Sequence, residues 1–233
     1  MLQIARILDD GKAVRLASVT DPKNTRERLI KAAIRAIEKE GESGVRIRDV
    51  CKATNTTAPS VYYFFGDRLG LIRAAQASRY QTPLAILQYD FAEGVYRCKD
   101  KTEFTKLVHE TLIVVFSEKR KSIRSTRVNV LGSAQSDRLL SRELAKMHDF
   151  VNKTSAEPIR FAQAKGWIDQ DLNPQMFFSW LVGVINGRTL IELDGQHQLS
   201  SDWDRIAICS TCRVLGIDDP KPVKSSQRKR PAK

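Results

Sequence analysis

The feature that most constrains the fold of this 233-residue chain lies at residues 45–72, which read as two short helices joined by a tight turn. Ile47, Val50 and Cys51 are spaced as on one face of a first short helix. The small polar residues 54–57, Thr-Asn-Thr-Thr, then form a turn cluster. A helix this short cannot bury its apolar face alone, so a partner helix must follow directly.

The residues after the turn predict that partner. Thr57 is a favourable N-cap, and Pro59 is tolerated in the first helical turn. The helix runs to Phe65, where the dipeptide 66–67, Gly-Asp, breaks it and caps a further helix that begins at Arg68. The two short helices with the turn between them form a helix-turn-helix unit.

The rest of the chain reads as helices. Asn24 and Glu27 form a capping box that starts a first helix, and Gly41 ends it. Further breaks are predicted near Pro83, Asp100–Thr102, Glu118–Ser122, Ser133–Asp137, Gly166, Gly195–Ser201 and Gly216. No alternating pattern of useful length indicates a strand. We therefore expect an all-α fold with an N-terminal three-helix helix-turn-helix domain and a larger helical domain.

The charge is unevenly distributed along the chain. Its formal net charge is +12, from 39 basic and 27 acidic residues. The predicted helix-turn-helix domain, residues 23–72, carries 10 basic and 6 acidic groups, and the tail 217–233 carries 6 and 2, so each has a net charge of +4. The arm 1–22 is neutral, and the domain 73–216 spreads +4 over 144 residues. This excess indicates a polyanionic partner, nucleic acid before a membrane surface, although a basic surface can also serve solubility alone. The tail has the composition of a disordered segment, which either binds phosphates or stays solvated.

Composition excludes several other classes. The longest uncharged run, residues 172–187, is shorter than the roughly 20 apolar residues of a membrane-spanning helix. Arg6, Asp9 and Asp10 interrupt any signal-peptide core, and four cysteines are too few for a disulfide scaffold. We expect a cytoplasmic protein without a membrane partner.

Motifs for catalysis or for a bound metal are missing from the sequence. It has no Gly-rich phosphate loop, no His-Glu-x-x-His and no Gly-x-Ser-x-Gly, so we expect neither an enzyme nor a cofactor. Cys209 and Cys212 form a lone CxxC inside a predicted helix. Without a second pair they are better explained as small buried residues than as zinc ligands.

The helix-turn-helix offers a set of DNA-binding candidates. Its second helix begins with small residues that allow close approach to base edges in a major groove, namely Thr57, Ala58, Pro59 and Ser60. The hydroxyls of Tyr62 and Tyr63 can reach phosphates, unless these rings belong to the core. Arg68 is a further phosphate candidate. Arg46 and Arg48 either meet phosphate or form a merely solvated helix end.

These residues resemble the TetR family of transcriptional regulators. The similarity covers residues 25–72, and its most specific part is Ser-Val-Tyr-Tyr at 60–63 with the Phe and Gly-Asp-Arg residues that follow. Residues 166–174 are also similar to the family's approach to its dimerisation helix. The chain departs from the family where Gly is usual at Asn55, and Asn tolerates the left-handed conformation that such a turn needs. Other departures are Arg46, Thr56, Phe64 and Arg68.

The resemblance implies a homodimeric repressor that binds a palindromic operator and releases it when a small molecule enters the helical domain. We expect the dimer to form through helices at 174–193 and 201–215, with interface candidates Gly183, Gly187, Trp203 and Ile206. Either glycine could instead face the core of its own subunit. The effector candidates, which suggest an apolar or amphipathic ligand, are His109, Thr111, Phe116, Asn129, His148 and Trp180. The alternative is a ligand-independent architectural or activating DNA-binding protein.

Overall fold

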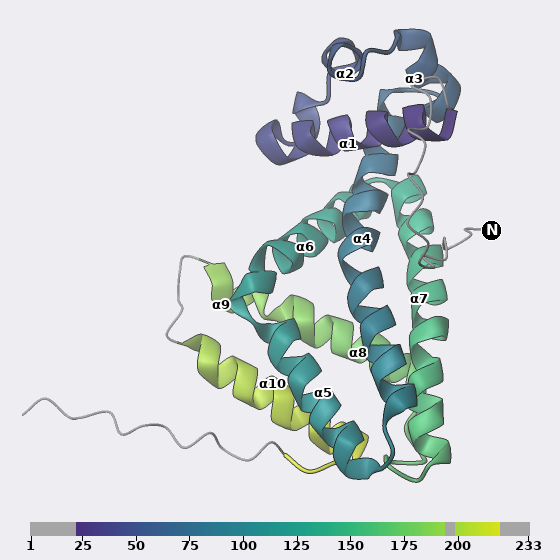
Figure 1. The fold of residues 1–233 in the computed structure, drawn as a ribbon. Helices are drawn as coiled ribbons and strands as arrows, with labels where there is room; N and C mark the ends of the chain where they lie inside the picture. Colours follow the sequence, from purple (N-terminus) through teal and green to yellow (C-terminus); the bar gives the residue numbers. More distant parts are fainter. Residues whose placement is uncertain (1–21, 194–198, 220–233) are drawn as a thin grey trace, which may run out of the picture. The chain divides into compact units, whose positions relative to one another are not determined.

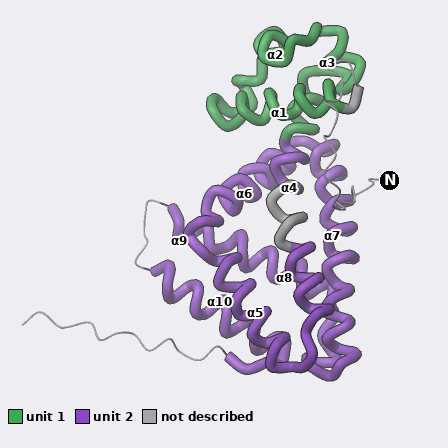
Figure 2. Tube along the Cα trace, viewed as in Figure 1, with its two compact units in different colours: residues 1–75 green, residues 76–233 purple. Residues whose placement is uncertain are grey.

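The computed structural model describes residues 22–193 and 199–219, and these residues form helices and turns without a strand. The all-α prediction is confirmed. The chain divides into two compact units, residues 1–75 and 76–233 (Figure 2). Except for Pro22 and residues 217–219, the predicted N-terminal arm and basic tail lie outside the described residues.

The first unit contains three helices and the start of a fourth (Figure 1). They are α1 (Pro22–Glu40), α2 (Ile47–Thr54), α3 (Ala58–Phe65) and α4 (Arg68–Arg97), with a short 3-10 turn η1 (Glu42–Gly44) after α1. The predicted start of α1 at Asn24 is wrong by two residues, because Pro22 fits the first turn of a helix. Gly41 ends α1 as predicted, with a φ of 72°.

The core of the first unit is aliphatic. One buried cluster takes side chains from all four helices and from the segment before α2, chiefly Leu29, Ala33, Ile37, Val45, Val50, Val61 and Leu71. Arg28 on α1 also donates from Nη2 to the carbonyl oxygen of Thr54 at 2.8 Å. This bond ties α1 to the last residue of α2, directly before the turn that leads into α3.

Helix α4 runs without interruption through Pro83, so the predicted break there is wrong. A proline inside a helix removes one backbone hydrogen bond, but neighbouring turns can carry the helix past it. The boundary between the two compact units falls inside α4, after Ala75. One helix therefore contributes residues to both units.

The second unit is a bundle of helices (Figure 1). Beyond the later turns of α4 it contains α5 (Lys101–Phe116), η2 (Glu118–Arg120), α6 (Lys121–Ser136), α7 (Arg138–Ala164), α8 (Pro174–Gly187), α9 (Thr189–Glu192) and α10 (Ser200–Leu215). Helix α7 packs against α6 and α8, and α5 packs against α10. Side chains of Asp100, Asp137 and Asn173 cap the N-termini of α5, α7 and α8. The predicted breaks after α4, α5, α6, α7 and α10 are confirmed.

The main core of the second unit combines aliphatic side chains with four large aromatic residues. Phe104, Phe116, Trp167 and Phe177 are buried in one cluster. The segment between α7 and α8 closes this core, since the N–H of Asp169 donates to the carbonyl of Leu215 at 3.1 Å. This arrangement holds α5, α7, α8 and α10 around a common interior.

Candidate nucleic-acid interface and effector cavity

The turn between α2 and α3 is tight because Asn55 adopts a left-handed conformation, with φ 51° and ψ 50°. The N–H of Thr56 donates to the carbonyl of Cys51 at 3.0 Å. The hydroxyls of Thr54 and Thr56 lie 2.8 Å apart, and Thr54 also donates to the carbonyl of Val50 at 2.8 Å. The turn thus forms with Asn in place of Gly, as the sequence predicts.

The first turn of α3 presents small side chains to solvent, while Val61 of the same helix anchors it in the core. Val61 is fully buried, whereas Thr57 and Pro59 are exposed and Ser60 is half-buried. The hydroxyls of Thr57 and Ser60 lie 3.2 Å apart. Ala58 is half-buried beside them. The predicted base-reading residues therefore lie together at the N-terminal end of one exposed helix.

The two tyrosines of α3 are surface residues rather than core residues. Tyr62 and Tyr63 are 52% and 82% exposed, and Tyr63 packs edge-on against Phe64 with ring centroids 5.0 Å apart. At the other end of the motif, Arg46 and Arg48 are also exposed, and Nε of Arg48 lies 3.5 Å from the carboxylate of Asp49. These four side chains can reach a partner without any rearrangement of the domain.

Arg68 differs from its prediction as a free cation for phosphate. Its Nε donates to the carbonyl of Val45 at 2.6 Å, and its Nη2 donates to the carbonyl of Glu42 at 2.6 Å. The guanidinium therefore satisfies carbonyls of the segment that links α1 to α2. We assign Arg68 to supporting the domain, and the start of α4 is capped by Asp67, whose carboxylate accepts from the N–H of Gly70 at 2.6 Å.

A basic hollow on the first unit was not predicted. Four of its lining residues are cationic, Arg28, Lys31 and Arg35 from α1 and Lys52 from α2. The α1 residues recur at spacings of three and four, which places them on one helix face. That spacing was visible in the sequence and was overlooked beside the stronger signal of α3.

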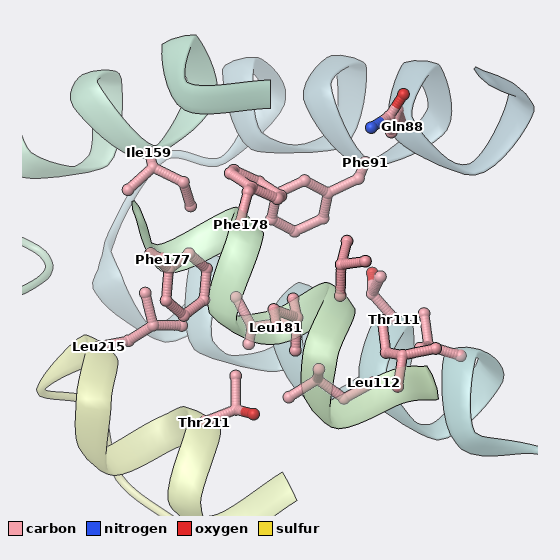
Figure 3. Close-up of a pocket in the computed structure, with 14 residues that line it drawn as sticks. Gln88, Phe91, Thr111, Leu112, Ile159, Phe177, Phe178, Leu181, Thr211 and Leu215 are labelled. Carbon is pink, nitrogen blue, oxygen red and sulfur yellow. The ribbon is translucent and has the colours of Figure 1, made fainter. Parts of the chain in front are cut away.

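The second unit contains an apolar cavity of about 100 Å³. Side chains from five helices converge on it (Figure 3). They are Gln88 and Phe91 of α4; Val108, Thr111, Leu112 and Val115 of α5; Ile159 of α7; Phe177, Phe178, Leu181, Val182 and Ile185 of α8; and Thr211 and Leu215 of α10. Its few polar side chains lie on α4, α5 and α10.

Of the six predicted effector residues, Thr111 alone lines this cavity. His109 points elsewhere, with Nε2 3.0 Å from the carbonyl oxygen of Asp218. Phe116 is part of the solid core, and Trp180 is 39% exposed. The α5 residues that do line the cavity follow the spacing i, i+3, i+4, i+7, so helical phase would have separated them from His109.

The remaining two effector candidates lie away from the cavity lining. Asn129 is exposed, with its Oδ1 3.5 Å from a guanidinium nitrogen of Arg79. His148 is half-buried on α7, and its Nε2 lies 3.4 Å from the hydroxyl of Ser179. Burial lowers the pKa of the His148 imidazole, and Arg127 lowers this pKa further.

The predicted dimer residues have different surroundings. Gly183 is exposed on α8, and a Cβ added there would meet no atom within 4 Å. A Cβ at Gly187 would lie 3.4 Å from the ring of Trp203, which is half-buried on α10. Ile206 is 58% exposed. Gly183 and Ile206 are thus available to a partner, whereas Gly187 packs within its own subunit.

Two groups of buried arginines were missed by the sequence analysis. Arg124 and Arg188 bind the carboxylate of Glu192, and Arg188 also donates to Asp204 with Nε 2.6 Å from Oδ1. Arg127, one turn after Arg124 on α6, is buried beside Tyr80. The signal was present, since both α6 arginines fall in phase with the buried Val130 and Ala134.

Within the described part of the chain, no group of His, Cys, Asp or Glu side chains could hold a metal ion. Cys209 and Cys212 are free, and burial raises the pKa of Cys212 to about 12. No helix in the same part is long and apolar enough to cross a membrane.

Known proteins resemble this chain both in the helix-turn-helix domain and over most of its length. Residues 29–75 match the family described as "Bacterial regulatory proteins, tetR family". The chain is 21% identical over 180 residues to the probable HTH-type transcriptional regulator ArpR of Pseudomonas putida, which covers 73% of this chain and 82% of that protein.

Solved structures share the fold. Salmonella enterica GusR superposes with a TM-score of 0.62 at 18% identity, over 86% of this chain and 100% of that one. A protein from Saccharomonospora viridis, solved in complex with choline, superposes with a TM-score of 0.55 at 16% identity, over 79% and 94%.

Proposed function

We propose that this chain, which belongs to the TetR family of bacterial regulatory proteins, is a homodimeric repressor. It binds a palindromic operator and represses transcription until a small molecule releases it from the DNA. It is a DNA-binding transcription regulator and not an enzyme. The observation that carries the proposal is the exposed first turn of α3 over the buried Val61. Operator binding places its action in the cytoplasm.

Specificity is assigned to the start of α3. Ser60 and Pro59 face the base edges, with Thr57 and Ala58 beside them, because small side chains permit a helix end to approach the floor of a major groove. Tyr62 and Tyr63 lie farther along α3, where their exposed hydroxyls can bind phosphate oxygens.

Arg46 and Arg48 supply cations at the start of α2. Arg48 remains 91% exposed in spite of its contact with Asp49, so a phosphate can replace that weak surface pair. Contacts of this kind contribute affinity to every sequence and make binding dependent on salt.

The dimer is assigned to the outer faces of α8 and α10. Large apolar side chains are exposed there and in the short α9 region, namely Met176, Trp180, Leu190, Leu193, Leu199 and Ile206. Paired with the same helices of a second subunit, they form a four-helix arrangement. A two-fold dimer presents two copies of α3 to major grooves one turn apart, about 34–36 Å, which requires a palindromic operator.

The effector is assigned to the cavity. Cavities of roughly 150 Å³ lined by aliphatic and aromatic residues stay dry and bind benzene, so about 100 Å³ suits a small apolar group. Gln88 and Phe91 of α4 line this cavity, while Leu71 and Ile72 of the same helix lie in the core of the first unit. A ligand that displaces α4 therefore acts on a helix that the DNA-binding domain also uses.

The DNA-binding assignment is tested with an operator selected from random duplexes by the purified protein. We expect a palindromic consensus. Ser60→Ala should alter the preference among operators by about 1–3 kcal/mol. Arg48→Ala should weaken binding to all duplexes equally. It should also reduce the slope of log binding constant against log salt concentration by about 1. Equal weakening by both variants, without altered preference, would remove Ser60 from base reading.

The dimer assignment is tested by a matched pair of glycine variants. A Cβ at Gly183 on α8 and a Cβ at Gly132 on α6 both point into open space, so neither substitution disturbs its own subunit. Gly183→Glu places a charge in the proposed interface and should yield monomers that do not bind the operator cooperatively. Gly132→Glu should remain dimeric. A dimeric Gly183→Glu protein in sedimentation experiments would exclude this interface.

A further inference from the structure

Two buried arginines, three positions apart on α6, have different partners. Arg124 and Arg127 are 1% and 2% exposed. Arg124 is fully engaged, because Glu192 neutralises its charge and its Nη1 donates to the carbonyls of Val115 and Ser117 at 2.9 and 3.1 Å. It forms part of a closed structural cluster.

Among the described residues, every partner of Arg127 is uncharged. Its guanidinium lies 4.2 Å from the ring centroid of Tyr80, and its Nη2 donates to the Tyr80 hydroxyl at 3.0 Å. No carboxylate of the described ranges forms an ion pair with it, and burial lowers its pKa. A buried charge without a counter-charge is unfavourable, which favours an anion from outside the chain.

A polar cluster lies on α7 and α8, and one of its members, His148, is close enough to Arg127 for this cation to lower the pKa of its imidazole. Nδ2 of Asn152 donates to the hydroxyl of Ser179 at 2.7 Å, and that hydroxyl lies 3.4 Å from Nε2 of His148. The Asn152 side-chain oxygen is buried and has no hydrogen-bond partner in the described part of the molecule. Because the depressed pKa of His148 keeps its imidazole neutral, Arg127 is the charged member of this cluster.

This polar cluster adjoins the apolar cavity. His148, Asn152, Ser155 and Ile159 follow one another at spacings of four, three and four on a single face of α7. Ile159 lines the cavity, and Ser155 accepts a hydrogen bond at 2.8 Å from Gln88, which also lines it. Ile159 lies seven positions after Asn152 along α7, which corresponds to about 10 Å.

We propose that the effector of this regulator is an amphipathic carboxylic acid, whose carboxylate pairs with Arg127 and whose apolar group, about as large as one aromatic ring, fills the cavity. This inference rests on the proposed function, which assigns an effector to the cavity but does not define its charge.

Ligand binding to the wild-type full chain tests the charge assignment. The probes are phenylalkanoates with two to eight methylene groups, together with the amides and amines of the same length, titrated by calorimetry at pH 7.5 without DNA. We expect at least one carboxylate to bind tenfold or more tightly than its amide, and the amines to bind most weakly. Amides that bind as tightly as the carboxylates would overturn the proposal, and so would the absence of binding by every carboxylate at millimolar concentration.

Variants then test whether Arg127 is responsible. Arg127→Gln should bind the carboxylate and the amide equally, whereas the exposed control Arg160→Gln on α7 should retain the wild-type preference. If circular dichroism shows that Arg127→Gln is unfolded, Arg127→Lys keeps a cation and should retain a reduced preference for the carboxylate. A wild-type preference in folded Arg127→Gln, or no preference in Arg127→Lys, would contradict the assignment.

These titrations contain no DNA, so they are independent of operator release. If the protein shows no preference for carboxylates, the charge assignment is wrong, but a neutral ligand can still release the operator. Conversely, a carboxylate that binds through Arg127 without weakening the operator complex would refute the proposed induction and not the charge of the site.

Discussion

The two units of this regulator place their polar groups in opposite ways. In the first unit, Thr54 is the single polar residue buried among the described residues. In the second, the buried polar and charged residues of the described ranges are Gln76, Arg124, Arg127, Asn152, Ser155, Arg188, Glu192 and Thr211. One unit has an aliphatic core with a polar outer face, whereas the other carries charge in its interior.

We attribute this difference to the sizes of the two proposed ligands. A DNA duplex must be met from outside, so the residues that contact it belong on an exposed helix such as α3. A molecule the size of one aromatic ring can be enclosed, so the groups that select it belong in the interior. Consequently, the first unit should be sensitive to loss of apolar packing and the second to loss of charge pairing.

The largest stability effect is expected from the closed charge cluster of the second unit. Glu192→Gln removes the carboxylate that Arg124 and Arg188 share, and this leaves Arg124 buried without a counter-charge. Breaking such a pair lowers the free energy of unfolding by about 3–5 kcal/mol. Urea denaturation measures this change. The control Glu157→Gln, whose carboxylate is exposed on α7, should stay close to wild type, and equal stability of the two variants would show that the cluster is not structural.

A packing defect should have a comparable or slightly smaller effect in the first unit. Leu29→Ala empties a fully buried position of the aliphatic core and should lower the free energy of unfolding by roughly 2–5 kcal/mol, together with operator affinity. Urea denaturation followed by circular dichroism measures the change in stability, and a binding titration measures the change in operator affinity. Leu69→Ala, at a half-exposed position of α4, is the control, and a loss as large as that of Leu29→Ala would contradict the assigned core.

The turn of the first unit gives a smaller effect. Asn55 holds a φ of 51°, a conformation that an ordinary L-residue adopts at a penalty of about 1–2 kcal/mol. Asn55→Ala should therefore lower the melting temperature, and Asn55→Gly should preserve or raise it. An alanine variant as stable as the glycine variant would mean that the left-handed turn is not required.

The smallest effect concerns pH and the interior of the second unit. The pKa of His148 is lowered in the folded chain by burial and by Arg127, although Asp149 opposes the shift. Because the unfolded chain then binds the proton more readily, stability falls as the pH drops below the ordinary histidine pKa of about 6.5. His148→Gln should lose less stability than wild type between pH 7.5 and 5.5. An identical loss in both proteins would argue against a buried neutral imidazole.

The sequence predicted the first unit better than the second, for physical reasons. Turn and cap residues such as Asn55 and Pro59 have local conformational preferences, so the helix-turn-helix could be predicted from the chain alone. Arg68 was predicted to contact phosphate, and in the structure it donates to the carbonyls of Glu42 and Val45, which suit a cation as well as phosphate does. Local preference cannot distinguish these partners.

In the second unit, most of the predicted effector residues lie outside the cavity lining, because the lining depends on tertiary packing. His109 and Trp180 were chosen by residue type, but the cavity is defined by the phase of α5 and α8. The buried Arg124 and Arg127 follow the same phase, and the expectation that charges are solvated concealed them. Their burial depends on partners such as Glu192 and Tyr80, more than forty residues away in the chain.

The most direct test of induced release is calorimetric titration of the tightest-binding phenylalkanoate into the purified protein, first free of DNA and then saturated with its operator. Linkage requires that the ligand lose the same factor of affinity in the presence of operator as the operator loses in the presence of ligand. We predict a factor of about 5–150, the usual range of such coupling. Equal ligand affinity with and without operator would show that filling the cavity does not release DNA, and it would contradict the account of this protein as a ligand-released repressor.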